Sequence, residues 1–70
     1  MVKKGILQEI FSKALYADNP STYVVTYRDH DIYRRIALDE FVFISEYFQK
    51  IPASRIIRVE LRGRILYEKN

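Results

Sequence analysis

The chain has 70 residues, a net charge of +3 and no cysteine. This length allows one domain with a modest core, and the lack of cysteine excludes both a disulfide framework and a zinc site built on thiolates. Because the longest apolar run, Phe41 to Ile44, is far shorter than the roughly 20 residues of a membrane-spanning helix, we expect a single cytoplasmic domain over residues 1–70 with no membrane segment.

The first predicted element is an amphipathic helix over residues 4–16. Its apolar residues recur at steps of three and four, and polar residues fill the other face. Pro20 cannot continue a helix and biases Asn19 away from helical geometry, so the helix ends before them.

A β-hairpin is predicted next, from Tyr23 to Ala37. Residues 23–27 are aromatic and β-branched, which is typical of a strand. Residues 32–37 form a second candidate strand, although an arginine interrupts its apolar face. The polar residues 28–31 between the two strands predict the turn.

Residues 38–50 fit two patterns. A helix is favoured because apolar side chains follow a helical stripe and Asp39 is a suitable N-cap residue. Residues 41–44, Phe-Val-Phe-Ile, are equally typical of a short strand. Pro52 ends either element.

A second hairpin is predicted between Arg55 and Tyr67. Its first strand alternates apolar residues, and Gly63 marks the turn. An extra residue at Gly63, as in a bulged turn, would place Ile65 and Tyr67 on the apolar face of the first strand. We expect the polar residues 68–70 to be frayed.

Together these elements predict an α+β fold, in which an N-terminal helix and a second helix pack on a small, mostly antiparallel sheet of two hairpins. The other face of the sheet, or its edge loops, would be open to a ligand. The residues that we expect to be buried are Ile10, Phe11, Leu15, Val25, Ile57, Val59 and Leu61.

Positive charge is concentrated in residues 50–70. This segment carries six lysines and arginines against two acids, whereas residues 1–49 carry six against seven. Four of its six cations are arginines, whose forked guanidinium suits phosphate. The pattern is typical of a solvated strand face, and it also favours a nucleic-acid partner.

Arg28, Ser54 and Arg55 are the candidate phosphate-binding residues. Pro52 stiffens the backbone shortly before Arg55, and Arg28 lies at the end of the first predicted strand. If these two strand ends meet, both guanidinium groups and the Ser54 hydroxyl form a small anion pocket. The competing interpretation is that Arg55 pairs with an acid of the first hairpin turn.

Residues near the first turn are candidates for contacts with a base. Tyr27 is the first candidate for stacking on an unpaired base and Tyr33 the second, with core packing as the alternative for each. Asp29 and His30 are candidates for polar contacts. Because His30 is the only histidine and no cofactor motif is present, we expect no metal, no cofactor and no catalytic residue.

The segments "NPSTYVVTYRDHD" and "KIPASRIIRVELRGRILYEK" resemble a small, mainly archaeal, uncharacterised domain family that is proposed to recognise cyclic-phosphate RNA ends. The resemblance implies a non-catalytic module that binds processed RNA ends beside an RNA-processing enzyme. The sequence departs from the family pattern at Ser54, where a histidine is usual, and serine cannot be protonated near neutral pH. His30 is a candidate replacement for that histidine. The matching residues are Tyr27, Arg28, Asp29, Ile51, Pro52, Arg55, Ile56, Gly63 and Tyr67.

Three functional hypotheses follow. The first is a module that binds single-stranded RNA or processed 3′ ends, carrying a terminal or cyclic phosphate, in RNA processing or repair. The second is a protein-interaction adaptor whose basic hairpin is the docking edge. The third is a phosphoesterase- or ligase-like enzyme, for which His30 is the one obvious general base. We expect the first, and no enzymatic activity.

Overall fold

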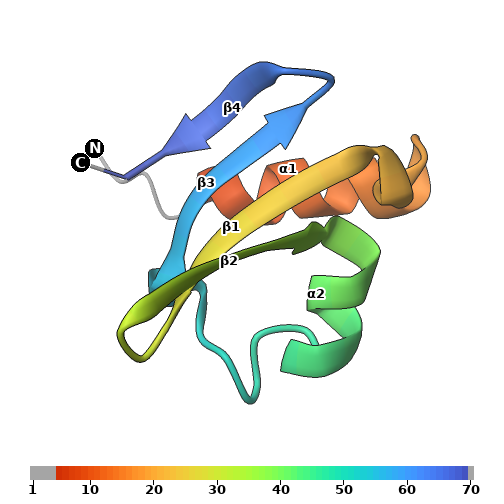
Figure 1. Cartoon of the computed structure of the whole chain (residues 1–70). Helices are drawn as coiled ribbons and strands as arrows, with labels where there is room; N and C mark the ends of the chain where they lie inside the picture. Colours follow the sequence, from red (N-terminus) through yellow and green to blue (C-terminus); the bar gives the residue numbers. More distant parts are fainter. Residues whose placement is uncertain (1–4, 70) are drawn as a thin grey trace.

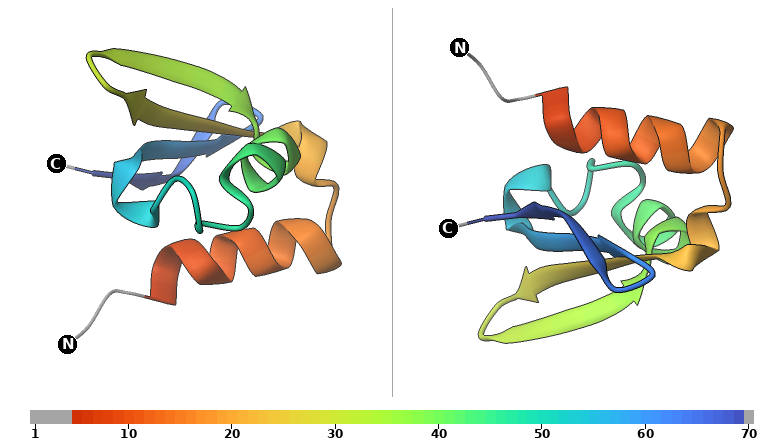
Figure 2. Two further views of the ribbon diagram at one scale, coloured as in Figure 1. Left: turned by 90° about the horizontal axis from the view of Figure 1, so that it is seen from below. Right: turned by 90° about the horizontal axis from the view of Figure 1, so that it is seen from above.

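The computed structural model describes residues 5–69 and shows an α+β domain (Figure 1). Four strands form one antiparallel sheet in the order β2-β1-β3-β4, and both helices pack on one of its faces (Figure 2). The predicted fold class, with two hairpins and two helices, is therefore confirmed. The elements are α1 (Gly5–Tyr16), the 3-10 turn η1 (Pro20–Thr22), β1 (Tyr23–Asp29), β2 (Ile32–Ala37), α2 (Leu38–Ser45), the 3-10 turn η2 (Ala53–Arg55), β3 (Ile56–Leu61) and β4 (Arg64–Glu68).

Helix α1 follows the predicted amphipathic pattern. Phe11 and Ala14 are completely buried on the face that meets the sheet. Lys4, the first residue of the predicted helix, lies outside the described residues. Within residues 5–69, no helix is long and apolar enough to cross a membrane.

Residues 38–45 are helical, so the strand alternative for this segment is wrong. The N-cap position is Ala37 and not Asp39. Asp39 lies in the first turn, where its negative charge interacts favourably with the helix dipole. The helix also ends well before Lys50. Glu46, Tyr47 and Phe48 are all left-handed, with φ of 50°, 54° and 73°.

The left-handed turn after α2 returns Phe48 to the core. The centroid of its ring lies 5.0 Å from the ring centroid of Phe11 and 6.1 Å from that of Phe41. The fully buried Ser45 supports the turn, because its Oγ accepts a hydrogen bond of 3.2 Å from the Phe48 N–H. The packing of Phe48 explains why the helical stripe in the sequence runs past the end of the helix.

A β-bulge in β3 changes which isoleucine faces the core. Thr26 of β1 pairs with Arg58, but the next residue, Tyr27, pairs with Ile56, so Ile57 is the extra residue. Ile56 is consequently fully buried, and Ile57 is only partly buried. The prediction that Ile57 belongs to the core is wrong for this reason, since a bulge re-aims the side chains around it.

The β3–β4 hairpin has its bulge away from the turn. Arg62 and Gly63 are both left-handed, with φ of 54° and 81°, and form a two-residue turn that pairs Leu61 with Arg64. The register shifts further along, where Tyr67 pairs with Val59. The extra residue predicted at Gly63 is therefore wrong in position, although Tyr67 does lie opposite Val59 as that prediction required.

The core lies between the sheet and the two helices. Phe11, Val25 and Val59 are fully buried as predicted, whereas Ile10, Leu15 and Leu61 are partly buried against them. The other fully or nearly fully buried apolar residues are Ala14, Tyr23, Tyr27, Leu38, Phe41 and Ile56.

Candidate anion-binding site

An open pocket of about 760 Å³ lies where the β1–β2 turn, η2 and the end of β4 meet. It brings together the three residues that the sequence predicts as phosphate ligands. The residues that line it are Arg28, His30, Asp31, Tyr33, Ser54, Arg55, Ile57 and Lys69.

The pairing of β1 with β3 brings the two arginines together. Tyr27 pairs with Ile56 in an antiparallel register, so Arg28, which follows Tyr27, and Arg55, which precedes Ile56, lie at the same end of the sheet. Pro52 precedes η2, and the Arg55 N–H donates to its carbonyl oxygen at 3.0 Å. This tight turn sets the place of Ser54 and Arg55 at the start of β3.

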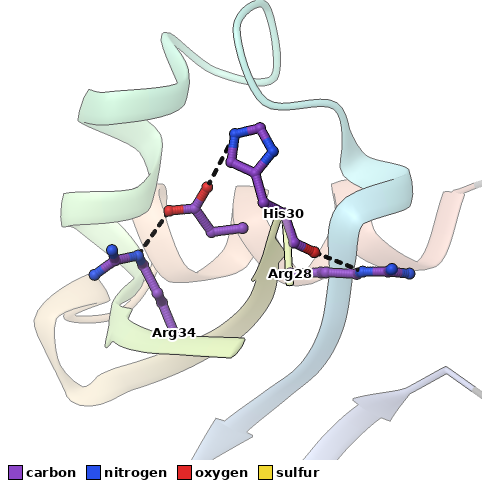
Figure 3. Close-up of polar contacts among 4 residues, drawn as sticks. Arg28, His30 and Arg34 are labelled. Carbon is purple, nitrogen blue, oxygen red and sulfur yellow. Dashed lines mark hydrogen bonds and ion pairs between the residues drawn. The ribbon is translucent and has the colours of Figure 1, made fainter. Parts of the chain in front are cut away.

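Arg28 supports the β1–β2 turn and still presents its charge to the pocket. Its Nε donates a hydrogen bond of 3.0 Å to the carbonyl oxygen of His30, which has a left-handed φ of 58°. Figure 3 shows the Arg28 side chain extending from the turn in the opposite direction to Arg34. The bond uses Nε alone, so the outer nitrogens of the guanidinium remain available to an anion.

Lys69 is a site residue that sequence reasoning missed. Its backbone N–H donates to the Ile57 carbonyl at 2.8 Å, and its Nζ donates to the Ser54 carbonyl oxygen. The expectation that residues 68–70 fray is therefore wrong for Glu68 and Lys69, because β4 extends through Glu68 and Lys69 is bonded to β3, whereas Asn70 lies outside the described residues. Only the proximity of the C-terminal end of β4 to η2 reveals this role, and no local motif signals it.

The pocket has an excess of positive charge. Among residues 5–69, Arg28, Arg55 and Lys69 share the lining of the pocket with one carboxylate, that of Asp31. Neither Arg28 nor Arg55 forms an ion pair within residues 5–69, so the predicted alternative, in which Arg55 pairs with an acid of the turn, does not occur there. Like charges held close together attract a shared anion.

Three other arginines of the sheet are paired with acids. The Nε of Arg34 lies 2.7 Å from the Asp29 carboxylate (Figure 3), Arg35 lies 3.0 Å from Glu60, and Arg58 lies 2.9 Å from Glu68. Asp29 is thus engaged with Arg34 and does not line the pocket, so the structure does not bring this candidate to the site.

The two tyrosines proposed for base stacking differ in exposure. Tyr27 is 5% exposed, and its ring packs edge-on against Phe41 at 5.1 Å, so it offers no face to a base. Tyr33 is 66% exposed and lines the pocket. The alternation of β1 explains the difference, because Tyr27 shares the inward face with Tyr23 and Val25.

His30 reaches the pocket but has no close acid partner. Its side chain is 89% exposed, and its Nε2 lies 3.9 Å from the Asp29 Oδ1, beyond hydrogen-bond distance. Across residues 5–69, no group of three or more histidines, cysteines and acids could hold a metal ion. No protein-family model, curated protein or solved structure matches this chain.

Proposed function

We propose that the chain is a non-catalytic RNA-binding module that recognises processed 3′ ends, with a terminal or cyclic phosphate as the bound group. The observation that carries this proposal is the cluster of Arg28, Arg55 and Lys69 around one pocket, without a balancing set of acids. Action in RNA processing or repair, beside an RNA-processing enzyme in the cytoplasm, is part of the same proposal, which the family resemblance of the sequence favours.

The size of the pocket supports recognition of an RNA end. A volume of about 760 Å³ is in the range of small-ligand sites and suits one nucleotide with its phosphate. The charges converge on one place and do not form the long stripe that a duplex requires. Tyr33 supplies an exposed ring on which the terminal base can stack.

The proposal assigns binding and not catalysis to the pocket. A general base needs a partner that orients it within hydrogen-bond distance. The exposed His30 has its nearest acid at 3.9 Å, and Ser54 uses its carbonyl oxygen to bind Lys69. The Ser54 hydroxyl is then a donor to the bound phosphate.

The decisive experiment compares short RNAs that differ only at the 3′ end. NMR titrations with a 2′,3′-cyclic phosphate, a 3′-phosphate and a 3′-hydroxyl would locate the site and measure selectivity together. We expect both phosphate ends to bind more tightly than the hydroxyl end and to shift the amides of Arg28, Ser54, Arg55 and Lys69. With two or three phosphate contacts, log affinity should fall against log salt concentration with a slope of about −1.5 to −2.

Equal affinity for all three ends would contradict end recognition and leave general RNA binding. No RNA binding at all would favour the adaptor hypothesis instead. In that hypothesis the β3–β4 hairpin is the docking edge, where Arg62 and Arg64 are exposed and Ile65 is 48% exposed.

A further inference from the structure

A second surface of the molecule is apolar and acidic. It consists of Ile36 at the end of β2, Val42, Phe43 and Ile44 of α2, and Tyr47 in the left-handed turn, and we call it the α2 patch. Phe43 is 82% exposed, and Ile44 and Tyr47 are each 41% exposed. Contiguous exposed apolar side chains of this kind mark interaction surfaces.

Two shallow, open hollows lie on the α2 patch. One hollow of about 670 Å³ lies on the Val42 and Tyr47 side of Phe43, and another of about 470 Å³ lies on the Ile36 side. Phe43 and Ile44 line both hollows and separate them.

One side of the α2 patch, at Tyr47, is anchored on the core. The Tyr47 ring packs at 5.4 Å against Phe48, which in turn packs on Phe11 at 5.0 Å. The Tyr47 N–H donates to the Val42 carbonyl oxygen at 3.0 Å. The Tyr47 ring is therefore already ordered and loses little conformational entropy when a partner binds.

Charge identifies the kind of occupant. Asp39, Glu40 and Glu46 border the hollows, and the one ion pair among them in the described part of the chain joins Glu46 to Lys50 at 3.4 Å. These carboxylates repel RNA and anionic lipid. They also disfavour a two-fold dimer through this patch, because each copy would present the same acids to the other.

We propose that the α2 patch docks a segment of another protein that presents apolar side chains flanked by lysine or arginine. This site shares no lining residue with the anion-binding pocket. Helix α2 and the β1–β2 turn also lie at opposite ends of β2 (Figures 1 and 2). RNA and the partner segment can therefore bind at the same time, and the inference does not depend on the RNA-binding proposal.

The test begins with a display library of random 16-residue peptides, selected on the immobilised full chain. We expect enriched peptides to combine apolar residues with lysine or arginine. In fluorescence polarisation, Phe43→Ala should weaken the best peptide at least tenfold, and the double variant D39N/E40Q should weaken it several-fold at low salt. An RNA with a 3′-phosphate should not compete with the peptide.

Tyr16→Ala is the matched control, because Tyr16 lies on α1 and is as exposed as Phe43, at 82%. It should leave peptide affinity unchanged. Phe43→Leu, which keeps an apolar side chain, separates loss of the contact from loss of folding, and circular dichroism verifies each variant. The proposal is overturned if no peptide is enriched, if the enriched peptides lack basic residues, or if Phe43→Ala and Tyr16→Ala bind the peptide equally.

Discussion

The anion-binding pocket and the α2 patch are built in opposite ways. The pocket is formed by strand ends and turns, and its charged side chains lie at the surface without balancing acids. The α2 patch is formed by a helix and a left-handed turn, where Phe43 is exposed and the Tyr47 ring packs against Phe48. The pocket leaves positive charge without a paired acid in the described residues, and the α2 patch leaves apolar side chains exposed.

The largest expected effect comes from truncating a side chain in the core on which both surfaces depend. Phe41 is fully buried and contacts Phe11, Tyr27 and Phe48. Phe41→Ala should cost about 3–5 kcal/mol, which is comparable to the whole stability of a domain of this size. We expect circular dichroism and NMR to show a largely unfolded chain with neither binding activity.

Phe41→Leu serves as the control for this variant, because it leaves a smaller cavity and should retain a cooperative melt. A Phe41→Ala variant that melts at the wild-type temperature would contradict the assignment of Phe41 to the core.

Arg55→Ala should separate the two surfaces. Loss of a charge-assisted hydrogen bond costs about 1.5–3 kcal/mol, so the affinity for a 3′-phosphate RNA should fall about 10- to 150-fold. The melting temperature and the affinity of the α2 patch for its peptide should remain unchanged. Arg64→Ala removes the same charge at the far end of β4 and should have a much smaller effect. Equal losses in the two variants would indicate binding to diffuse charge and not to the pocket.

Glu46→Gly should stabilise the chain by relieving a left-handed backbone. Glu46 ends α2 with φ of 50°, a conformation that costs an ordinary residue about 1–2 kcal/mol and costs glycine little. The exposed ion pair with Lys50 offsets only about 0.3–0.5 kcal/mol of this gain. Thermal melts should show a rise of a few degrees for glycine, whereas Glu46→Ala, which loses the pair without relieving the backbone, should not gain.

The smallest expected effect concerns acid stability at Asp18, which belongs to neither surface. The backbone N–H of Asn19 and then the Tyr23 hydroxyl donate to its carboxylate, each at 3.0 Å, and they hold the pKa of Asp18 below its ordinary value of 3.8. A lowered pKa in the folded state gives stability that is present above the unfolded value and is lost as pH falls through the folded one.

Asp18→Asn should therefore flatten the dependence of melting temperature on pH below about 4. Thermal melts of both proteins between acidic and neutral pH measure this difference, and identical pH profiles would show that the hydrogen bonds do not contribute. Binding at either surface should be the same for both proteins at neutral pH.

Local patterns in the sequence predict much of the fold. The three- and four-residue spacing of apolar side chains predicts α1, and the β-branched and aromatic residues of β1 predict the first hairpin. Each of these signals depends on neighbours within a few residues, so it survives whatever the rest of the chain does. The same holds for the position of the turn at Arg62 and Gly63, although the bulge expected at Gly63 lies further along the hairpin.

The site was predictable in part. Arg28, Ser54 and Arg55 could be proposed together from Pro52, the strand ends and the family resemblance, and they do line one pocket. The burial of Tyr27, the exclusion of Asp29 by Arg34 and the arrival of Lys69 could not be predicted. Each of these depends on pairing between segments that are distant in the sequence or on the face that a strand turns toward the core.

The sequence by itself determined α1, the two hairpins and the position of their turns, because those choices follow from backbone preferences and from the period of apolar side chains. Residues 38–50 fit both a helix and a strand, and the structure decided between them. Only the tertiary structure decided which side chains share a surface. A single bulge between β1 and β3 turned Ile56 inward and Ile57 toward the pocket, and the packing of Phe48 ended α2 at Ser45. Both outcomes are set by the close packing of the shared core, where a shift of one residue moves a side chain from one face to the other.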